Sequence, residues 1–160
     1  MKKTKIIIHH SASSPSTTWE QINEWHRQRG FTKSILGWYI GYHYVCFPDG
    51  KIRQARTIEE TGCHCVPNED KVGICLIGDF TKAEPTKEQY ATLENRIGYL
   101  LEELQVSSDA VYGHREFKAT ECPGNPVMEW IKMYRQIGWL KERIRQIQAM
   151  LANRRETYKN

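Results

Sequence analysis

Short apolar runs along this chain alternate with segments in which apolar residues recur at the spacing of a helix. Ile6, Ile7 and Ile8 make a β-branched run within residues 4–9, and this predicts a short strand buried on both faces. Aromatic and β-branched composition, with turn residues at 48–50, predicts further strands at 41–47, 51–55, 72–77 and 110–112.

Three helices are predicted between these strands. Thr17 and Glu20 have capping-box spacing for a helix that runs to Arg29 and ends at Gly30. A second capping box begins the next helix, and Pro126 begins a third. Interleaved strands and helices predict an α/β fold with a central mixed β-sheet flanked by helices. The second helix has Thr86 and Gln89 at its cap and apolar residues in helical period at Leu93, Ile97, Leu100, Leu101 and Leu104.

The last segment, 134–160, differs from the rest and is predicted to be a separate amphipathic basic helical tail after a domain at 1–133. Six basic and two acidic residues lie in 141–160, so this segment holds the whole net charge of +4. We expect its apolar stripe to pack on the body or on a second copy of the chain. The alternative is contact with an anionic envelope surface. The stripe has heptad spacing at Ile137, Leu140, Ile144, Ile147 and Leu151.

Length and composition suit one soluble domain. The chain has 160 residues, 39% apolar and 26% charged, and no apolar stretch of membrane-spanning length. The apolar run after Lys2, Lys3 and Lys5 is too short for a signal peptide, so we expect a chain that is made and used in the cytoplasm or exported by a route that the sequence does not encode. Five cysteines, an odd number, argue against a disulfide framework and favour reduced thiols.

Two distant parts of the chain carry candidate metal ligands. His114 follows a predicted strand, and Cys122 lies in the polar loop after it, just before a Pro-Gly turn. A third ligand is expected from the end of the first strand, where His9 and His10 are adjacent and only one of them can face the metal. Zinc accepts histidine nitrogen and cysteine thiolate, and a catalytic site keeps one position open for water. His9, His114 and Cys122 are the predicted set, with His10 as the alternative.

Several ordered blocks resemble one family, the type 2 N-acetylmuramoyl-L-alanine amidases, which include small bacteriophage lysozymes of amidase type and share their fold with peptidoglycan-recognition proteins. The resemblance spans about residues 4–133. Its blocks are Ile6-Ile7-Ile8-His9-His10-Ser11-Ala12, Gly41-Tyr42-His43-Tyr44, Gly62-Cys63-His64, Val72-Gly73-Ile74-Cys75-Leu76-Ile77-Gly78, Gly113-His114-Arg115-Glu116 and Cys122-Pro123-Gly124.

The resemblance implies a zinc-dependent hydrolase that cleaves the amide between N-acetylmuramic acid and L-alanine in peptidoglycan. It implies that His9, His114 and Cys122 hold Zn²⁺. It also implies that Tyr42 is the catalytic tyrosine and that His64 lines the substrate groove. Thr120 stands where some phage relatives have lysine, so a neutral hydroxyl would assist catalysis there.

A second departure is Asp70-Lys71, where the family usually has Asn-Ser or similar, and it bears on the groove contacts. No carboxylate pair is placed for glycoside cleavage. The expected partner is the muropeptide stem of peptidoglycan, with no nucleic acid. The resemblance favours a bacteriolytic, antimicrobial phage or prophage endolysin, made in the host cytoplasm and reaching the cell wall through holin-type release. Two alternatives are a recognition module that binds peptidoglycan without cutting it, in which the cysteine ligand is commonly lost, and an amidase that also regulates a polymerase.

Overall fold

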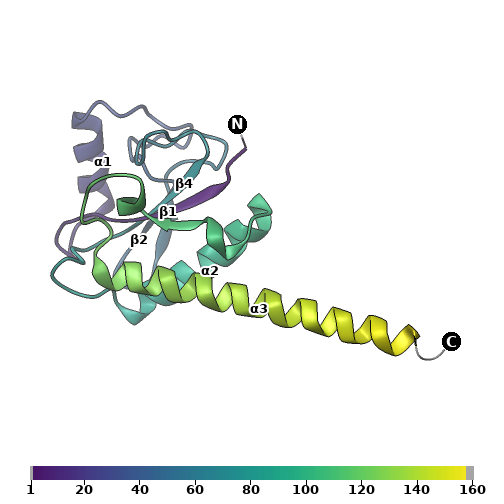
Figure 1. Cartoon of the computed structure of the whole chain (residues 1–160). Helices are drawn as coiled ribbons and strands as arrows, with labels where there is room; N and C mark the ends of the chain where they lie inside the picture. Colours follow the sequence, from purple (N-terminus) through teal and green to yellow (C-terminus); the bar gives the residue numbers. More distant parts are fainter. Residues whose placement is uncertain (1, 158–160) are drawn as a thin grey trace.

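A five-stranded mixed sheet forms the centre of the molecule, as predicted (Figure 1). The computed structural model describes the backbone of residues 2–157 and the side chains of residues 2–152. The sheet order is β3-β2-β4-β1-β5; β2 and β3 are antiparallel, and the other neighbouring strands are parallel. The strands are β1 (Lys5–His10), β2 (Tyr44–Cys46), β3 (Ile52–Gln54), β4 (Lys71–Leu76) and β5 (Val111–Gly113).

Helices α2 (Lys87–Leu104) and α3 (Asn125–Thr157) pack on one face of the sheet. The predicted capping box of Thr86 and Gln89 is present at the start of α2. The predicted apolar positions of α2 face the core, where Leu93, Ile97 and Leu100 are at most 1% exposed. The larger of the two hydrophobic clusters therefore lies on this face, and its close packing holds the sheet rigid.

The opposite face is covered by α1 (Trp19–Gln28) and by long loops. The predicted capping box of Thr17 and Glu20 is wrong by one residue, because Thr18 caps the helix and Gln21 completes the box. A glutamine side chain serves this role as well as glutamate does. The observed register places Trp19 and Ile22 in the core, each 2% exposed.

Strand β2 is shorter than predicted because residues 41–43 bend away from strand geometry. A Cβ on Gly41 would lie 2.6 Å from the carbonyl oxygen of Cys63, so this close approach requires glycine. The bend brings Tyr42 onto the α1 face, against the smaller hydrophobic cluster. His43 is fully buried and accepts a hydrogen bond from the backbone N–H of Gly73 (3.0 Å).

Helix α3 runs unbroken across the predicted boundary at 133/134, and its second half extends well beyond the body (Figure 1). Arg135, on the tail side of that boundary, is held to the body by an ion pair with Glu116 (3.0 Å). The stripe does not pack on the body within the described residues, and its packing on a second copy of the chain stays a prediction. Residues 158–160 of the predicted tail lie outside the described residues. The stripe residues are each about half exposed: Ile137, Leu140, Ile144, Ile147 and Leu151.

Within residues 2–157, no helix is both long enough and apolar enough to cross a membrane.

Candidate metal centre

His9 and His10 close strand β1 and point to opposite faces of the sheet, as strand alternation requires. His10 accepts a hydrogen bond from the backbone N–H of Phe80 (3.1 Å), which ties it to the loop after β4. His9 shares its face with Cys75, its register partner on β4. The structure therefore brings His9, and not His10, to the other two predicted ligands.

The other two ligands come from the loop that follows β5. His114 begins a short 3-10 turn, His114–Glu116, directly after the strand. The backbone N–H of Arg115 donates to the carbonyl of Cys122 (2.9 Å), which closes this loop on itself. The Arg115 guanidinium also donates to Asn125 (2.7 Å) and to the carbonyl of Glu121. These bonds hold the imidazole and the thiol at a fixed separation.

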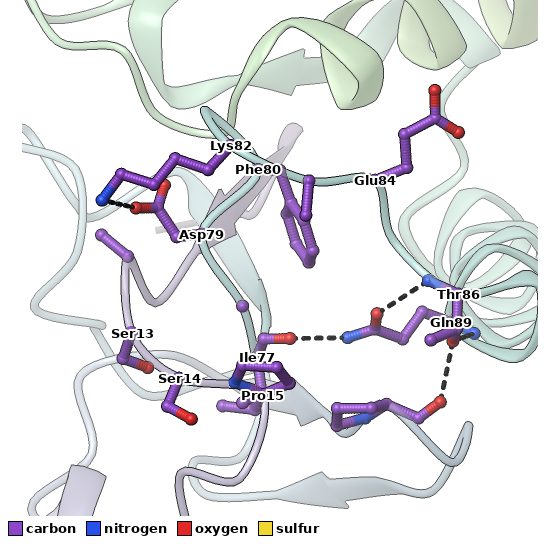
Figure 2. Close-up of a pocket in the computed structure, with 14 residues that line it drawn as sticks. Ser13, Ser14, Pro15, Ile77, Asp79, Phe80, Lys82, Glu84, Thr86 and Gln89 are labelled. Carbon is purple, nitrogen blue, oxygen red and sulfur yellow. Dashed lines mark hydrogen bonds and ion pairs between the residues drawn. The ribbon is translucent and has the colours of Figure 1, made fainter.

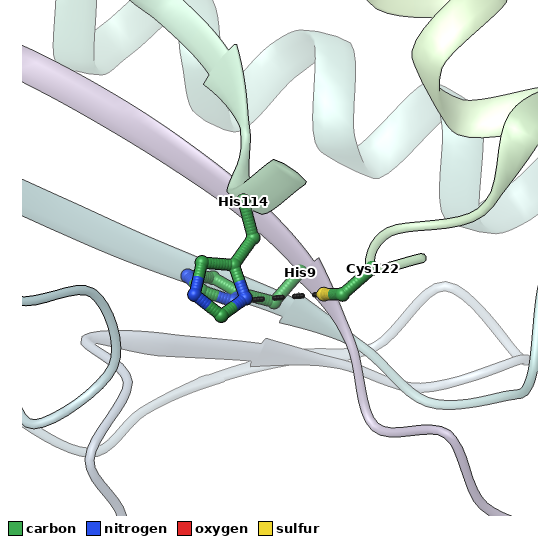
Figure 3. A group of neighbouring side chains, drawn as sticks. All are labelled: His9, His114 and Cys122. Carbon is green, nitrogen blue, oxygen red and sulfur yellow. Dashed lines mark hydrogen bonds between the residues drawn. The ribbon is translucent and has the colours of Figure 1, made fainter. Parts of the chain in front are cut away.

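His9, His114 and Cys122 converge at the carboxyl ends of the neighbouring parallel strands β1 and β5 (Figure 3). One potential ligand atom from each lies within 4.8 Å of the others. His9 Nδ1 lies 3.7 Å from Cys122 Sγ, and the His9 and His114 ring centroids are 4.4 Å apart. The Cys122 sulfur also accepts the backbone N–H of His10 (3.4 Å), a contact that favours a thiolate.

Burial sets the charge state of these three groups. It lowers the pKa of His9 well below 6.5, and the neighbouring His64 and His114 lower it further. Burial also lowers the pKa of His114, with Lys118 acting in the same direction. Both imidazoles are therefore neutral at pH 7, which is the form that binds a metal. Burial raises the pKa of the Cys122 thiol to about 12, so the thiol needs a nearby cation to become a thiolate.

The donor set fits zinc. Two imidazoles and one thiol are ligands that zinc accepts, and three protein ligands are the number found in catalytic zinc sites. A thiolate ligand disfavours Mg²⁺ and Ca²⁺, which prefer oxygen. All three side chains also line one groove, so a fourth position would face solvent and substrate.

Tyr42 lies beside this group, with its ring centroid 5.1 Å from that of His9. Burial raises the pKa of its phenol well above 10, and the thiols of Cys75 and Cys122 raise it further. Tyr42 therefore keeps its proton over the physiological range and can act as a hydrogen-bond donor.

Thr120 also lies in the groove, in the loop between the two ligands. Its hydroxyl oxygen accepts the backbone N–H of Cys122 (3.3 Å). This bond uses an oxygen lone pair and leaves the hydroxyl hydrogen available to a ligand in the groove.

His64 reaches the group from the loop before β4. Its Nδ1 lies 3.0 Å from His9 Nε2, on the side of the His9 ring away from Cys122. The loop is held by Asn68, whose side-chain oxygen accepts the backbone N–H groups of His64 (2.9 Å) and Cys65 (2.7 Å). The predicted groove residue thus touches a candidate metal ligand directly.

The groove has a volume of about 770 Å³ and collects every predicted site residue. No Asp or Glu lines it in the described part of the chain. Sequence reasoning missed Arg29 and Lys118, which put positive charge on its rim. Lys118 had a usable signal, its place in the His114–Cys122 loop. Arg29 had no such sequence signal, because only the folded structure brings the C-terminal end of α1 to the groove.

The Asp70-Lys71 departure is structural. The Lys71 side chain is 2% exposed, and its ammonium pairs with Asp70 (3.0 Å) and donates to the carbonyl of Pro67. Lys71 therefore lies behind the groove and is out of reach of a ligand in it. All five cysteines are free thiols, as the odd number predicted, and Cys46 and Cys75 are buried.

A second hollow of about 490 Å³ lies beyond Ala12, beside the loop that follows β4 (Figure 2). Several of its polar groups are already engaged in hydrogen bonds or an ion pair. Lys82 pairs with Asp79 (2.9 Å), Gln89 donates to the carbonyl of Ile77 (3.0 Å), and Thr86 donates to that of Pro48 (2.7 Å). These bonds stabilise the α2 cap and make the hollow a poorer candidate for chemistry than the groove.

Comparisons with known proteins agree with this geometry. Residues 1–125 match the family model for N-acetylmuramoyl-L-alanine amidase. Among solved structures, the N-acetylmuramoyl-L-alanine amidase LysC from Clostridium intestinale is 30% identical, with a TM-score of 0.72. That match covers 82% of this chain and 84% of LysC.

Animal recognition proteins are similar to the chain as well. Peptidoglycan-recognition protein SC1a of Drosophila melanogaster is 29% identical over 137 residues, which are 83% of this chain and 71% of that protein. A Drosophila PGRP-LB mutant solved in complex with tracheal cytotoxin is 27% identical, with a TM-score of 0.67, over 81% of this chain and 79% of that one.

Proposed function

Because the chain belongs to the N-acetylmuramoyl-L-alanine amidase family, we propose that it is a zinc-dependent hydrolase of peptidoglycan. The bond cleaved is the amide between the lactyl group of N-acetylmuramic acid and L-alanine. The observation that carries this proposal is the convergence of His9, His114 and Cys122 in an open groove.

The three ligands would hold one Zn²⁺. When bound, zinc supplies a Lewis acid that polarises the scissile carbonyl and activates water for attack. The neutral imidazoles are ready to coordinate, and the backbone N–H of His10 supports the Cys122 thiolate.

Tyr42 and Thr120 act on the reacting amide. As the carbonyl carbon becomes tetrahedral, negative charge grows on its oxygen, and preorganised donors stabilise that charge. The Tyr42 phenol is such a donor because it stays protonated, and the free hydrogen of the Thr120 hydroxyl is a second. Water adds to the carbonyl carbon and the C–N bond breaks. The proton that the attacking water loses can be relayed through the Tyr42 hydroxyl to the leaving amine of L-alanine, so Tyr42 ends the reaction protonated, as it began.

The groove favours an acidic peptide next to the scissile bond. Arg29 and Lys118 line it, and no carboxylate does so in the described residues. Cations of this kind pair with the carboxylates of a muropeptide stem. The similar PGRP-LB structure with tracheal cytotoxin supports a ligand-binding groove in this fold.

The alternative is a module that recognises peptidoglycan without cutting it, and the similarity to recognition proteins favours it. Cys122 weighs against this alternative, because a binding module has no need of a thiol aimed at two imidazoles. The test uses purified sacculi and zinc-loaded protein. We expect turbidity to fall and new L-alanine amino termini to appear. Protein that sediments with sacculi and releases no amino termini would be a recognition module.

We place the amidase activity in a phage or prophage endolysin that acts on the cell wall after holin-type release from the host cytoplasm. Support comes from the similar endolysin amidase LysCS of Clostridium intestinale, which is 30% identical with a TM-score of 0.72. Expression in a bacterial cytoplasm tests this placement. Cells should lyse when a holin is co-expressed and stay intact without it.

A further inference from the structure

His64 occupies an enclosed position behind the candidate metal ligand His9. A Cβ on Gly73 would lie 2.7 Å from the His64 ring, and one on Gly62 would lie 2.5 Å from it. The ring meets that of His9 edge-on, with centroids 5.0 Å apart and planes at 85°. Two glycines and a neighbouring ring thus fix the orientation of His64.

Neither ring nitrogen of His64 is available to a ligand in the groove. Nδ1 is engaged with His9 Nε2 at 3.0 Å. Nε2 is buried and has no hydrogen-bond partner among the described residues. Only the carbon edge of the ring can contribute to the groove wall, so polar recognition of substrate by His64 has no atom to use.

The two nitrogens of His9 have separate tasks. Nδ1 faces Cys122 Sγ at 3.7 Å and is the atom placed to coordinate a metal, so it must be free of hydrogen. The proton of neutral His9 then lies on Nε2, which donates to His64 Nδ1. In zinc sites a ligand histidine commonly donates its second N–H to an acceptor that fixes its tautomer and orientation.

We propose that His64 is the positioning residue that holds His9 in its zinc-binding tautomer, in place of the substrate contact that the family resemblance implies. The inference rests on the proposed function, because it assigns a role toward the zinc that His9 would bind. It predicts that the proton of His64 lies on the buried Nε2.

The test compares two substitutions of nearly equal shape. His64→Asn keeps an acceptor oxygen two bonds from Cβ, where Nδ1 stood, whereas His64→Leu has a methyl group there. Zinc affinity is measured on the full chain by competition with a chromophoric chelator. We expect His64→Leu to weaken zinc binding by roughly 10–100-fold and His64→Asn to stay within about threefold of wild type, since it keeps the acceptor.

A spectroscopic readout separates positioning from packing. In the Co²⁺-loaded proteins, the visible bands should move in His64→Leu and stay near those of wild type in His64→Asn. His64→Gln, whose amide lies one bond further from the backbone, should behave like His64→Leu and serves as the test if the leucine variant does not fold.

The outcomes are distinct. Equal zinc affinity in wild type and His64→Leu overturns the positioning role, and so does an equal loss in both variants. A raised KM on sacculi with unchanged zinc affinity would return His64 to substrate binding. If wild type itself binds no zinc, the proposed function fails, which is a different result from any of these.

Discussion

In the groove, His9 is 1% exposed, and each of its ring nitrogens faces another side chain. In the distal part of α3, residues 139–157, the apolar side chains of Leu140 and Ile144 are 46% and 55% exposed. One region is held by contacts between segments far apart in sequence. The other is a helix whose apolar stripe is about half exposed in the described residues.

The difference shows where chemistry and attachment reside in this molecule. Catalytic geometry needs groups fixed by packing and by supporting hydrogen bonds, and only the groove provides them. The distal helix provides surface, with Lys141 and Arg143 beside its apolar stripe. If the two regions are independent, a change in one should leave the function of the other intact.

Removing the Tyr42 hydroxyl should produce the largest effect on catalysis. Loss of one preorganised donor to an oxyanion typically lowers kcat by roughly 10²–10³-fold, and we expect Tyr42→Phe to fall in this range on purified sacculi. Zinc content and KM should stay near those of wild type, because the ring remains in place. A loss below about fivefold would remove Tyr42 from the catalytic group.

Acid should unfold the groove face before it affects the distal helix. Burial lowers the pKa of both His26 and His43 from 6.5 to about 4, so the folded state binds fewer protons than the unfolded state between these values. The contribution of each histidine to the free energy of unfolding is therefore fully present above about pH 6.5. It is lost as the pH drops toward 4, by on the order of 3 kcal/mol per histidine. Urea unfolding as a function of pH measures this loss.

A matched variant sharpens the acid prediction. His26 accepts the backbone N–H of Gly41 through Nδ1 (3.0 Å), and protonation would break that bond. His26→Asn keeps an acceptor at that position and has no proton to gain, so its stability should vary less between pH 6.5 and 4. An unchanged pH dependence would show that His26 is not among the responsible groups.

Thr120 should matter less than Tyr42. Thr120→Val removes the hydroxyl at constant shape, and the loss of one neutral hydrogen bond predicts a fall in kcat of up to about tenfold. Thr120→Ser keeps the hydroxyl and should retain most of the activity. Equal activity in the valine variant and wild type would show that Thr120 does not donate to the oxyanion and would leave that role to Tyr42.

Deleting residues 139–160 should have the smallest effect on the chemistry. This truncation keeps Arg135 and its ion pair with Glu116, and it keeps Gly138, which packs against Ser108. We expect zinc binding and activity on purified sacculi to stay within about twofold of the full chain, since exposed positions contribute little to stability. A larger loss would show that the two regions are coupled.

The same truncation separates the two remaining hypotheses for the apolar stripe. If the stripe contacts an anionic envelope, the truncated protein should attack intact cells less well while sacculi are digested at the same rate. If it pairs two copies of the chain, sedimentation should show a dimer that the truncation converts to a monomer.

Much of the fold could be predicted from local patterns. Strand β1 and the Thr86 cap of α2 follow from runs and spacings that act over a few residues. The α1 cap was displaced by one residue because Thr17 and Thr18 both suit the position, and only tertiary packing of Trp19 selects between them. Strand β2 was predicted to begin at residue 41 but begins at Tyr44, because Gly41 approaches Cys63 closely. No local sequence pattern encodes that contact.

The candidate site was predictable as a set of residues and less so as an arrangement. Residue type predicted His114 and Cys122 with one of His9 and His10, the family resemblance favoured His9, and the structure brings that set together. The contact of His64 with His9 could not be foreseen, because it joins residues 55 positions apart across the sheet face. The exposure of the apolar stripe of α3, which includes Leu140, could not be predicted either. A heptad pattern predicts that an apolar surface is covered, but it does not identify the partner that covers it.

The central claim is that His9, His114 and Cys122 hold the zinc on which amide cleavage depends. The most direct measurement is the zinc content of wild type and of Cys122→Ser, taken together with the release of L-alanine amino termini from sacculi. We expect one zinc per wild-type chain, and a folded serine variant with little zinc and no detectable release. Full activity in Cys122→Ser, or in wild type freed of metal by a chelator, would contradict the account.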